Sequence, residues 1–275
     1  LDNISLNNKE QRLQRLTGSI KPNSKEIEIN IEGILNESEF KFDGQIPHMQ
    51  DLINKILPGF NFPNKYKIKG NLHLNKFQYY SQRNKNDSPS IQLNQYPDLE
   101  IFLKLDKLNY NDLNIQKLSS IINKKENIIE IDDMQMNCLE GKSLATLRVK
   151  QSKDYDFAID GALLLENINI HRLFKEFKNF DQELLKAHHL KGSLTAQLKL
   201  NINTSSSMEI QESNLNVSGP YAIKNGELKS FEPLIELNKW LRKNKLLSTM
   251  IKVKEFDNII FGEIKNNLNF QSRLF

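Results

Sequence analysis

Residues 190–202 read LKGSLTAQLKLNI, and this stretch decides the fold. From Leu194 to Ile202 an apolar residue occupies every second position, and Thr195, Gln197 or another polar residue fills the positions between. Successive side chains of a strand point to opposite faces, so the alternation predicts a strand with one apolar and one polar face. A second alternation follows, with four residues on one side: Leu215, Val217, Tyr221 and Ile223.

The second alternation ends at Asn225-Gly226, where two positive φ angles cost little, so we expect the chain to turn there. A helix is predicted near 232–243, because Pro233 suits a first helical turn and apolar residues recur at helical spacing. These apolar residues are Leu234, Leu237, Trp240 and Leu241. Residues 251–270 return to strand-like apolar pairs. The C-terminal part therefore reads strand, strand, helix, strand.

Four short segments carry a family resemblance by their order: LKGSL at 190–194, IKNGEL at 223–228, FEPL at 231–234 and FDNI at 256–259. Together they resemble the C-terminal region of the AsmA-like family, well over 190–275 and more loosely from about Tyr155. That family is similar in architecture to bridge-like lipid-transfer proteins, whose long curled sheets offer an apolar groove to acyl chains. The resemblance implies a mostly β protein of the bacterial cell envelope.

The resemblance also implies a location, a partner and a role. The body of the protein would lie in the periplasm of a diderm bacterium, tethered to the inner membrane by an N-terminal anchor. The chain begins at Leu1 and not at Met, so we expect a fragment from which that anchor is missing. The partner would be a phospholipid or another envelope lipid, in lipid transport and outer-membrane biogenesis. The residues expected to line the groove are Leu194, Leu198, Leu215, Val217 and Ile223.

Length and composition indicate a folded protein. The chain has 275 residues, of which 38% are hydrophobic and 26% charged, so it can bury a sizeable core. The 38 basic and 34 acidic residues are interspersed, which argues against a nucleic-acid partner. Two short basic clusters, Lys124-Lys125 and Arg242 to Lys245, are expected on the surface. With a single cysteine, Cys138, the chain can form no intrachain disulfide and no cysteine metal site. The sequence contains no run of about 18 apolar residues, so it predicts no membrane-spanning helix.

We predict a mainly β, α+β fold: an elongated, curled antiparallel sheet with a few short amphipathic helices. Residues 1–150 would form a β-rich N-terminal part and residues 151–275 the AsmA-like region, although residues 1–25 look irregular. Helices are predicted near 47–57, from an apolar stripe, and near 169–180, with Asn169 as N-cap. The predicted strands outside the region already described are 27–31, 40–42, 66–79, 99–105, 113–122, 128–136, 144–149 and 155–159.

Two pairs of segments indicate an internal repeat. Residues 40–46, FKFDGQI, resemble residues 157–163, FAIDGAL, and residues 68–72 resemble residues 190–194. Each half would consist of a strand, an Asp-Gly turn, an amphipathic helix and a Lys-Gly strand. A duplicated strand-helix-strand unit of this kind would make the fold grow in one direction.

The sequence shows no catalytic constellation. His188 and His189 are adjacent, which is poor geometry for joint metal ligation, and the other three histidines stand alone. Gly141-Lys142-Ser143 mimics the end of a phosphate-binding loop but lacks the earlier glycine, since Met136 stands at that position. We therefore predict a protein that is not an enzyme, with no cofactor, no metal and no catalytic residue.

The apolar strand faces allow two interpretations that alternation cannot separate. They can form a closed core beneath the helices and a folded-over sheet. They can also line an open groove for acyl chains. Two functions remain open accordingly: a protein that shelters lipid acyl chains, or a structural envelope scaffold that assists outer-membrane protein assembly without a ligand.

Overall fold

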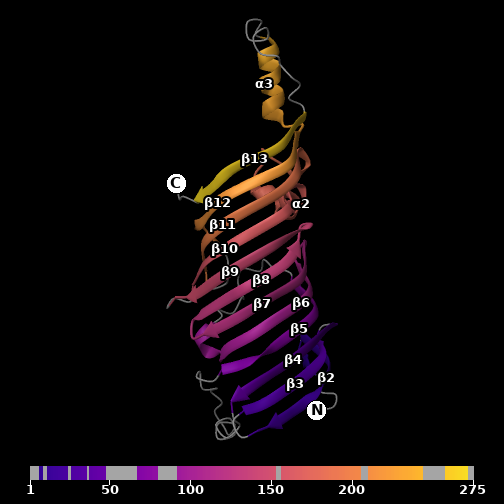
Figure 1. Ribbon diagram of the computed structural model, residues 1–275, viewed down its shortest axis with the longest axis vertical. Coiled ribbons are helices and arrows are strands. Elements are labelled where there is room, and N and C mark those ends of the chain that lie inside the picture. The colour runs from indigo at the N-terminus through magenta and orange to yellow at the C-terminus, as the bar shows by residue number, and fades with distance from the viewer. Residues whose placement is uncertain are drawn as a thin grey trace.

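A computed structural model describes residues 6–8, 11–23, 26–35, 37–47, 67–79, 92–152, 156–205, 210–243 and 258–271. The fold is mainly β, and thirteen strands form one sheet in the order in which they follow along the chain (Figure 1). The strands are β1 (Leu6–Asn8), β2 (Gln11–Pro22), β3 (Glu26–Leu35), β4 (Ser38–Pro47), β5 (Lys67–Tyr79), β6 (Asp98–Tyr110), β7 (Leu113–Lys125), β8 (Ile128–Cys138), β9 (Gly141–Gln151), β10 (Phe157–Asn169), β11 (Leu190–Thr204), β12 (Ile210–Lys229) and β13 (Asn258–Gln271). The described helices are α2 (Ile170–Glu176) and α3 (Glu232–Lys243), with 3-10 turns η1 (Leu93–Gln95), η2 (Lys178–Asp181) and η3 (Ala187–His189).

The sheet is mixed, whereas the sequence predicted an antiparallel one. Every neighbouring pair is antiparallel except β5 and β6, which run parallel with Ile68 opposite Leu99. A parallel pair needs a connection that returns from the end of one strand to the start of the next. The connection between Tyr79 and Asp98 is the one concerned, and strand alternation carries no information about it. Residues 80–91 lie outside the described residues.

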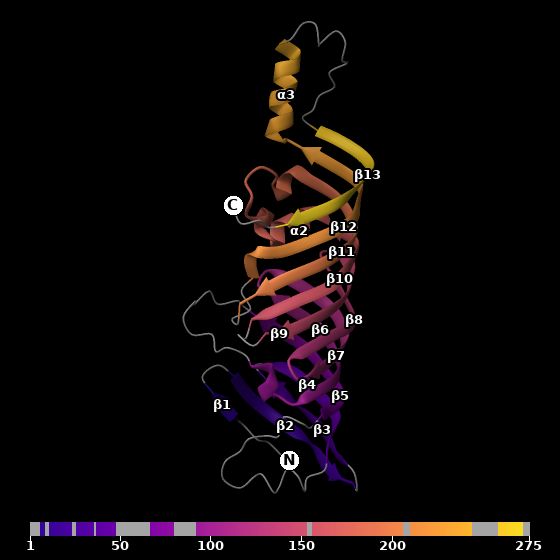
Figure 2. The ribbon, with the colours of Figure 1, turned by 90° about the vertical axis from the view of Figure 1, so that its left-hand side faces the viewer.

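The sheet is curled and does not close on itself. Figure 2 shows it bent around a hollow side, on which α2 lies, while α3 extends past the end formed by β12 and β13. Strands lie about 4.8 Å apart, so a sheet of this order is about 58 Å long across its strands. The predicted boundary at residue 150 falls at the end of β9. Because β9 pairs with β10, the two predicted parts of the chain contribute to one sheet.

Direct cross-strand partners point to the same side, which divides the side chains into two faces. One face is apolar in row after row, and we call it the inner face because α2 packs on it. A first row on it is Ile31, Phe42, Leu72 and Leu103 in β3 to β6. A second row, in β7 to β13, is Ile122, Ile131, Leu147, Gly161, Leu200, Val217 and Phe270. The opposite, outer face is mostly polar and carries ion pairs such as Lys191 Nζ to Glu227 Oε2 at 2.6 Å.

The Asp-Gly and Asn-Gly dipeptides do not form the predicted turns. Asp43-Gly44 lies inside β4, Asp160-Gly161 inside β10 and Asn225-Gly226 inside β12. The glycines leave room for neighbouring side chains instead: a Cβ on Gly44 would come within 2.3 Å of the Phe42 ring. Asn225 has the positive φ of 52° that was expected, but it lies in a bulge of β12, where the register with β11 shifts between Lys191 and Ser193.

In some strands the alternation of apolar and polar residues is interrupted, and bulges of this kind keep the apolar side chains on the inner face. At Lys117, Asp133 and Asn167, φ lies between 49° and 55°, and the register shifts there or beside it. One extra residue returns the apolar positions to the same face, so that Ile115 and Leu118 are both buried. Bulges also increase the local twist, which contributes to the curl.

The remaining element predictions have mixed outcomes. Residues 1–25 are not irregular throughout, because β1 and β2 lie among them. The helix predicted near 169–180 ends at Glu176, although Asn169 is its N-cap and accepts the Arg172 N–H at 3.0 Å. α3 spans the residues expected to form a helix there. The helix predicted near 47–57 and residues 251–257 lie outside the described residues, apart from Pro47 at the end of β4.

The two halves of the expected repeat pair differently. Gly44 stands opposite Gly70, whereas Gly161 stands opposite Leu200 and not opposite Gly192. The strand after the first pair joins in parallel and the strand after the second joins antiparallel. The duplicated unit therefore stays a prediction.

Candidate functional site

All five residues predicted to line a groove lie on the inner face. Leu194 stands in one cross-strand row with Ile168 and Ile223, and Leu198 stands opposite Leu163. Val217 and Leu215 stand opposite apolar partners in β11. Each of the five is partly exposed. The structure thus brings them onto one surface, and lipid contact by these residues stays a prediction.

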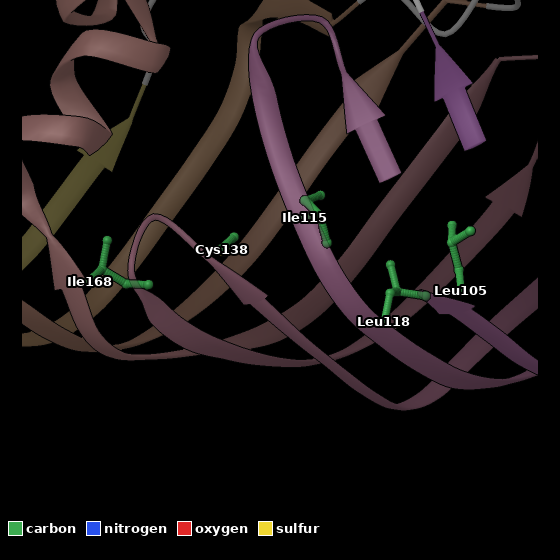
Figure 3. Packing of buried hydrophobic residues seen from close by; sticks show 5 residues of the cluster. All are labelled: Leu105, Ile115, Leu118, Cys138 and Ile168. Atoms are coloured by element: carbon green, nitrogen blue, oxygen red, sulfur yellow. The ribbon is translucent and has the colours of Figure 1, made fainter. Parts of the chain in front are cut away.

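One stretch of the inner face is a closed core beneath α2. Figure 3 shows Leu105, Ile115, Leu118, Cys138 and Ile168 projecting from their strands into one buried cluster. Ile168 is fully buried, and Leu173 of α2 packs against the cluster together with Leu194. Here the closed-core interpretation applies, because a helix covers the apolar side chains.

Polar contacts fix α2 over this core. Asn169 accepts the Arg172 N–H, and its side-chain amide donates to Glu140 Oε2 at 2.6 Å. Arg172 Nε lies 2.8 Å from Glu140 Oε1, and the Asn169 N–H donates to the Leu139 carbonyl at 2.9 Å. Because Glu140 belongs to the turn between β8 and β9, these contacts tie the start of α2 to a neighbouring part of the sheet rim.

A second cover lies at the opposite strand ends, where η1 crosses the inner face. Leu93 is buried against Val149 and Phe157. Its N–H donates to the Gln151 side chain at 2.8 Å, and Gln151 is itself buried. α2 follows the last residue of β10, whereas Phe157, against which Leu93 of η1 packs, is the first residue of β10. The two covers therefore lie at opposite rims of the sheet.

Lys124 also holds the η1 segment, and the sequence prediction placed it wrongly on the surface. Its side chain is only 4% exposed, Nζ donates to the Tyr96 carbonyl, and Asp98 Oδ1 lies 3.6 Å away. A signal was available: Lys124 continues the positions of Ser120 and Ile122, which alternate onto the inner face. Its neighbour Lys125 is exposed, as expected.

Elsewhere the inner face is open to different degrees. Between the two covers, Ile122, Ile131, Leu147 and Leu200 are partly exposed. At the ends of the sheet the exposure rises: Ile20 in β2 is 48% exposed, and Ile264 and Phe270 in β13 are 43% and 49% exposed. The inner face is therefore neither wholly a core nor wholly open, because two covers seal parts of it and leave a continuous apolar surface between and beyond them.

Exposed aromatic side chains stand beside the α2 cover. Phe177 and Phe180 stack with ring centroids 5.6 Å apart, and Phe174 meets Phe180 edge to face at 5.2 Å. Phe177 is 47% exposed and Phe180 is 53% exposed. They add an apolar rim to the inner face where α2 passes into η2.

The outer face offers a different kind of site. A depression of about 680 Å³ crosses β8 to β12, lined by two rows of outer-face residues and also by residues of the inner-face row between them, Leu163 and Leu198 among them. Leu144, Ala162, Leu164 and Pro220 contribute its apolar part, and Lys199 and Asp133 lie at its polar margin. Each row is interrupted by polar side chains, so this depression lacks the continuous apolar lining of the inner face.

Titratable groups on the outer face are paired. Glu100 lies between Lys67 and Lys69, and the hydrogen bond and charge of Lys67 lower the pKa of its carboxyl group. A hydrogen bond from Lys191 lowers the pKa of Glu227 in the same way. These ion pairs are spread along the outer face and do not converge on one point, which is typical of a solvated surface.

The histidines and the cysteine have structural partners. His171 Nδ1 lies 2.8 Å from the Ala187 carbonyl, and His189 Nδ1 accepts the Lys186 N–H at 3.0 Å. Burial, with the nearby His188 and Lys186, lowers the pKa of His189. Cys138 Sγ lies 3.2 Å from Ser143 Oγ in the core. Within the described ranges, no three His, Cys, Asp or Glu side chains lie close enough together to hold a metal ion.

Two further findings bear on the site. Among the helices that the structure describes, none has the length and apolar content to cross a membrane. No family model, no curated protein and no solved structure matches this chain.

Proposed function

We propose that this protein shelters the acyl chains of an envelope lipid on its inner face, without enzymatic chemistry. The observation that carries the proposal is the apolar row from Ile122 to Phe270, which crosses seven adjacent strands of an unclosed sheet. A sheet face of this length is normally covered by a second layer. Here the described covers are α2 and η1, and partly exposed apolar side chains lie between them.

The mechanism is passive transfer from water to an apolar surface. Each methylene that leaves water for the inner face is stabilised by about 0.8 kcal/mol. The rows run across the strands, so an acyl chain lying along them meets Leu163, Leu198 or their equivalents in each successive strand. A polar headgroup would stay at the rim of the sheet, where strand ends and turns supply hydrogen-bonding groups.

The location belongs to the same proposal. The resemblance of residues 190–275 to the AsmA-like family supports a periplasmic body tethered to the inner membrane of the cell envelope. A curled, elongated sheet with a partly open apolar face suits lipid transport between membranes, since acyl chains can lie along that face. The role would be lipid transport in outer-membrane biogenesis and envelope homeostasis.

A structural scaffold that assists outer-membrane protein assembly is the second candidate, and one observation favours it. β13 is 14 residues long, pairs with β12 on one side and has no described strand on the other. Such an edge can accept a strand from another protein by main-chain hydrogen bonding. Under this alternative the inner face carries no lipid.

The test compares two adjacent residues of β11. Leu198 lies on the inner face and Gln197 on the outer face, so Leu198→Asp and Gln197→Asp place the same charge on opposite sides of one strand. If the charge displaces two methylenes of a bound chain, binding weakens by about 1.6 kcal/mol, or roughly fifteen-fold. We expect this loss for Leu198→Asp, and less than about two-fold for Gln197→Asp, in a titration with a fluorescent fatty acid.

Lipid extracted from the purified protein supplies the second readout. We expect mass spectrometry to find bound lipid in the natural sequence and in the Gln197→Asp variant, at amounts comparable to the protein. Circular dichroism spectra establish that both variants are folded, and Ile264→Asp, at an exposed end of the same face, replaces Leu198→Asp if that variant unfolds. Absence of lipid from all folded proteins, with no fatty-acid binding, would refute lipid sheltering and favour the scaffold.

A further inference from the structure

Helix α3 projects from the protein along the long axis of the sheet. Both views show it extending past the end formed by β12 and β13 (Figures 1 and 2). At its base the Phe231 ring meets the His189 ring, with the ring centroids 5.9 Å apart, and the Phe231 carbonyl accepts the Leu234 N–H of the first helical turn at 2.9 Å. No described strand or helix packs along its length. The free end of α3, near Lys243, therefore faces away from the sheet.

Two large apolar side chains on this helix face solvent. Trp240 is 56% exposed and Leu237 is 43% exposed. Three residues apart, they are neighbours on one side of the helix, while Asn238 and Leu241 on the adjoining side are buried. Tryptophan combines an apolar ring with one N–H donor, which is the combination found where a protein meets the boundary between a membrane and water.

The free end of α3 is also positively charged. Its acidic residues, Glu232 and Glu236, lie in the first half, while Lys239, Arg242 and Lys243 lie in the second. From Glu236 to its last residue, Lys243, the helix carries no further acidic residue, and Lys239 lies 3.8 Å from Glu232 while Arg242 and Lys243 are exposed at the end. A run of one sign next to exposed tryptophan is the charge pattern that anionic lipid headgroups attract.

We propose that the free end of α3 docks on an anionic phospholipid bilayer. Trp240 and Leu237 enter the headgroup region, and Arg242 and Lys243 lie among the lipid phosphates. The bilayer accounts for both features, since a nucleic acid would match the charge but give Leu237 no apolar partner. A second copy of this chain would bring like charges together. Docking needs no acyl chain on the inner face, so this inference stands apart from the proposed function.

The sequence supplies a local probe for this contact, because Trp240 is its only tryptophan. The full chain is mixed with vesicles of phosphatidylcholine alone or with added phosphatidylglycerol, and tryptophan emission is recorded. We expect a blue shift with the anionic vesicles, quenching by lipids brominated on the acyl chain, and weakening with added salt. Vesicles of phosphatidylcholine alone should leave the emission almost unchanged.

Charge-reversed variants then locate the binding surface. Each basic residue near an anionic surface contributes about five-fold in affinity, so Arg242→Glu with Lys243→Glu should weaken vesicle binding by at least about thirty-fold. The matched control is Lys150→Glu with Lys199→Glu, which makes the same change in net charge at exposed positions on the outer face. Those sites lie far from α3, so their effect should stay below about three-fold.

Four results would overturn the inference. They are an unchanged emission with anionic vesicles, equal binding to neutral vesicles, an emission shift that grows with protein concentration in the absence of vesicles, and a shift produced by an oligonucleotide in place of vesicles. A loss of vesicle binding that is the same in the control variant would also overturn it. If vesicles fail to bind while the purified protein still carries lipid, docking by α3 is refuted and the proposed function is untouched.

Discussion

Two isoleucines in one cross-strand row allow the covered and open parts of the inner face to be compared directly. Ile168, Leu194, Ile223 and Ile264 stand opposite one another in β10 to β13. Ile168 lies under α2 and is 0% exposed, whereas Ile264 lies in the edge strand and is 43% exposed. The same substitution at both ends of this row therefore compares a side chain beneath a cover with one at the open edge of the sheet.

The expected magnitudes follow from what each substitution removes. Ile168→Ala deletes three buried carbon atoms, worth about 2.4 kcal/mol at 0.8 kcal/mol for each. A cavity remains because α2 is tied in place by Asn169 and Glu140, so the total loss should reach about 3–4 kcal/mol. Ile264→Ala removes atoms that are already half in water and leaves no enclosed cavity, so the loss should stay near or below about 1 kcal/mol.

Equilibrium urea unfolding, followed by far-ultraviolet circular dichroism, measures both losses. The denaturant dependence should be equal in the two variants, so that midpoints report stability alone. Equal losses in the two variants would refute the division of the inner face into covered and open parts. A loss above 3 kcal/mol for Ile264→Ala would show that the end of the sheet at β13 is as closed as the core beneath α2.

Two further predictions concern Lys124 and His189. Lys124→Met leaves the Tyr96 carbonyl and Asp98 without their lysine donor, so it should lower the free energy of urea unfolding by about 1–3 kcal/mol. The control Lys125→Met, at the exposed neighbour, should change that free energy by less than about 0.5 kcal/mol. Similar effects in the two variants would contradict the burial of Lys124. Burial lowers the pKa of His189 below 6.5, so the unfolded chain binds a proton first, and stability should fall as the pH drops through about 6.5 toward the folded pKa. His189→Gln should flatten that pH dependence of the urea midpoint, and an unchanged slope would count against it.

Local pattern predicted the strands well where alternation is unbroken. In residues 194–202 each side chain has its face set by the period of two, and no other part of the chain is needed to know it. The Asn169 cap could also be predicted, because a cap acts within three residues. By contrast, Asn225-Gly226 was taken for a turn. A positive φ serves a turn or a bulge equally, and only the pairing of β12 with β11 on both sides of Asn225 shows that it lies in a bulge.

Neighbours in the chain were enough to predict that this protein is mainly β and, where alternation is unbroken, which side of a strand is apolar. Which apolar residues are sealed depends on the tertiary structure. Leu93 reaches Gln151 from 58 residues away, and β5 joins β6 in parallel through a connection that alternation cannot encode. Burial depends on which groups lie opposite a side chain in space, so Ile168 is sealed beneath α2 while Ile264, in the same cross-strand row, is open.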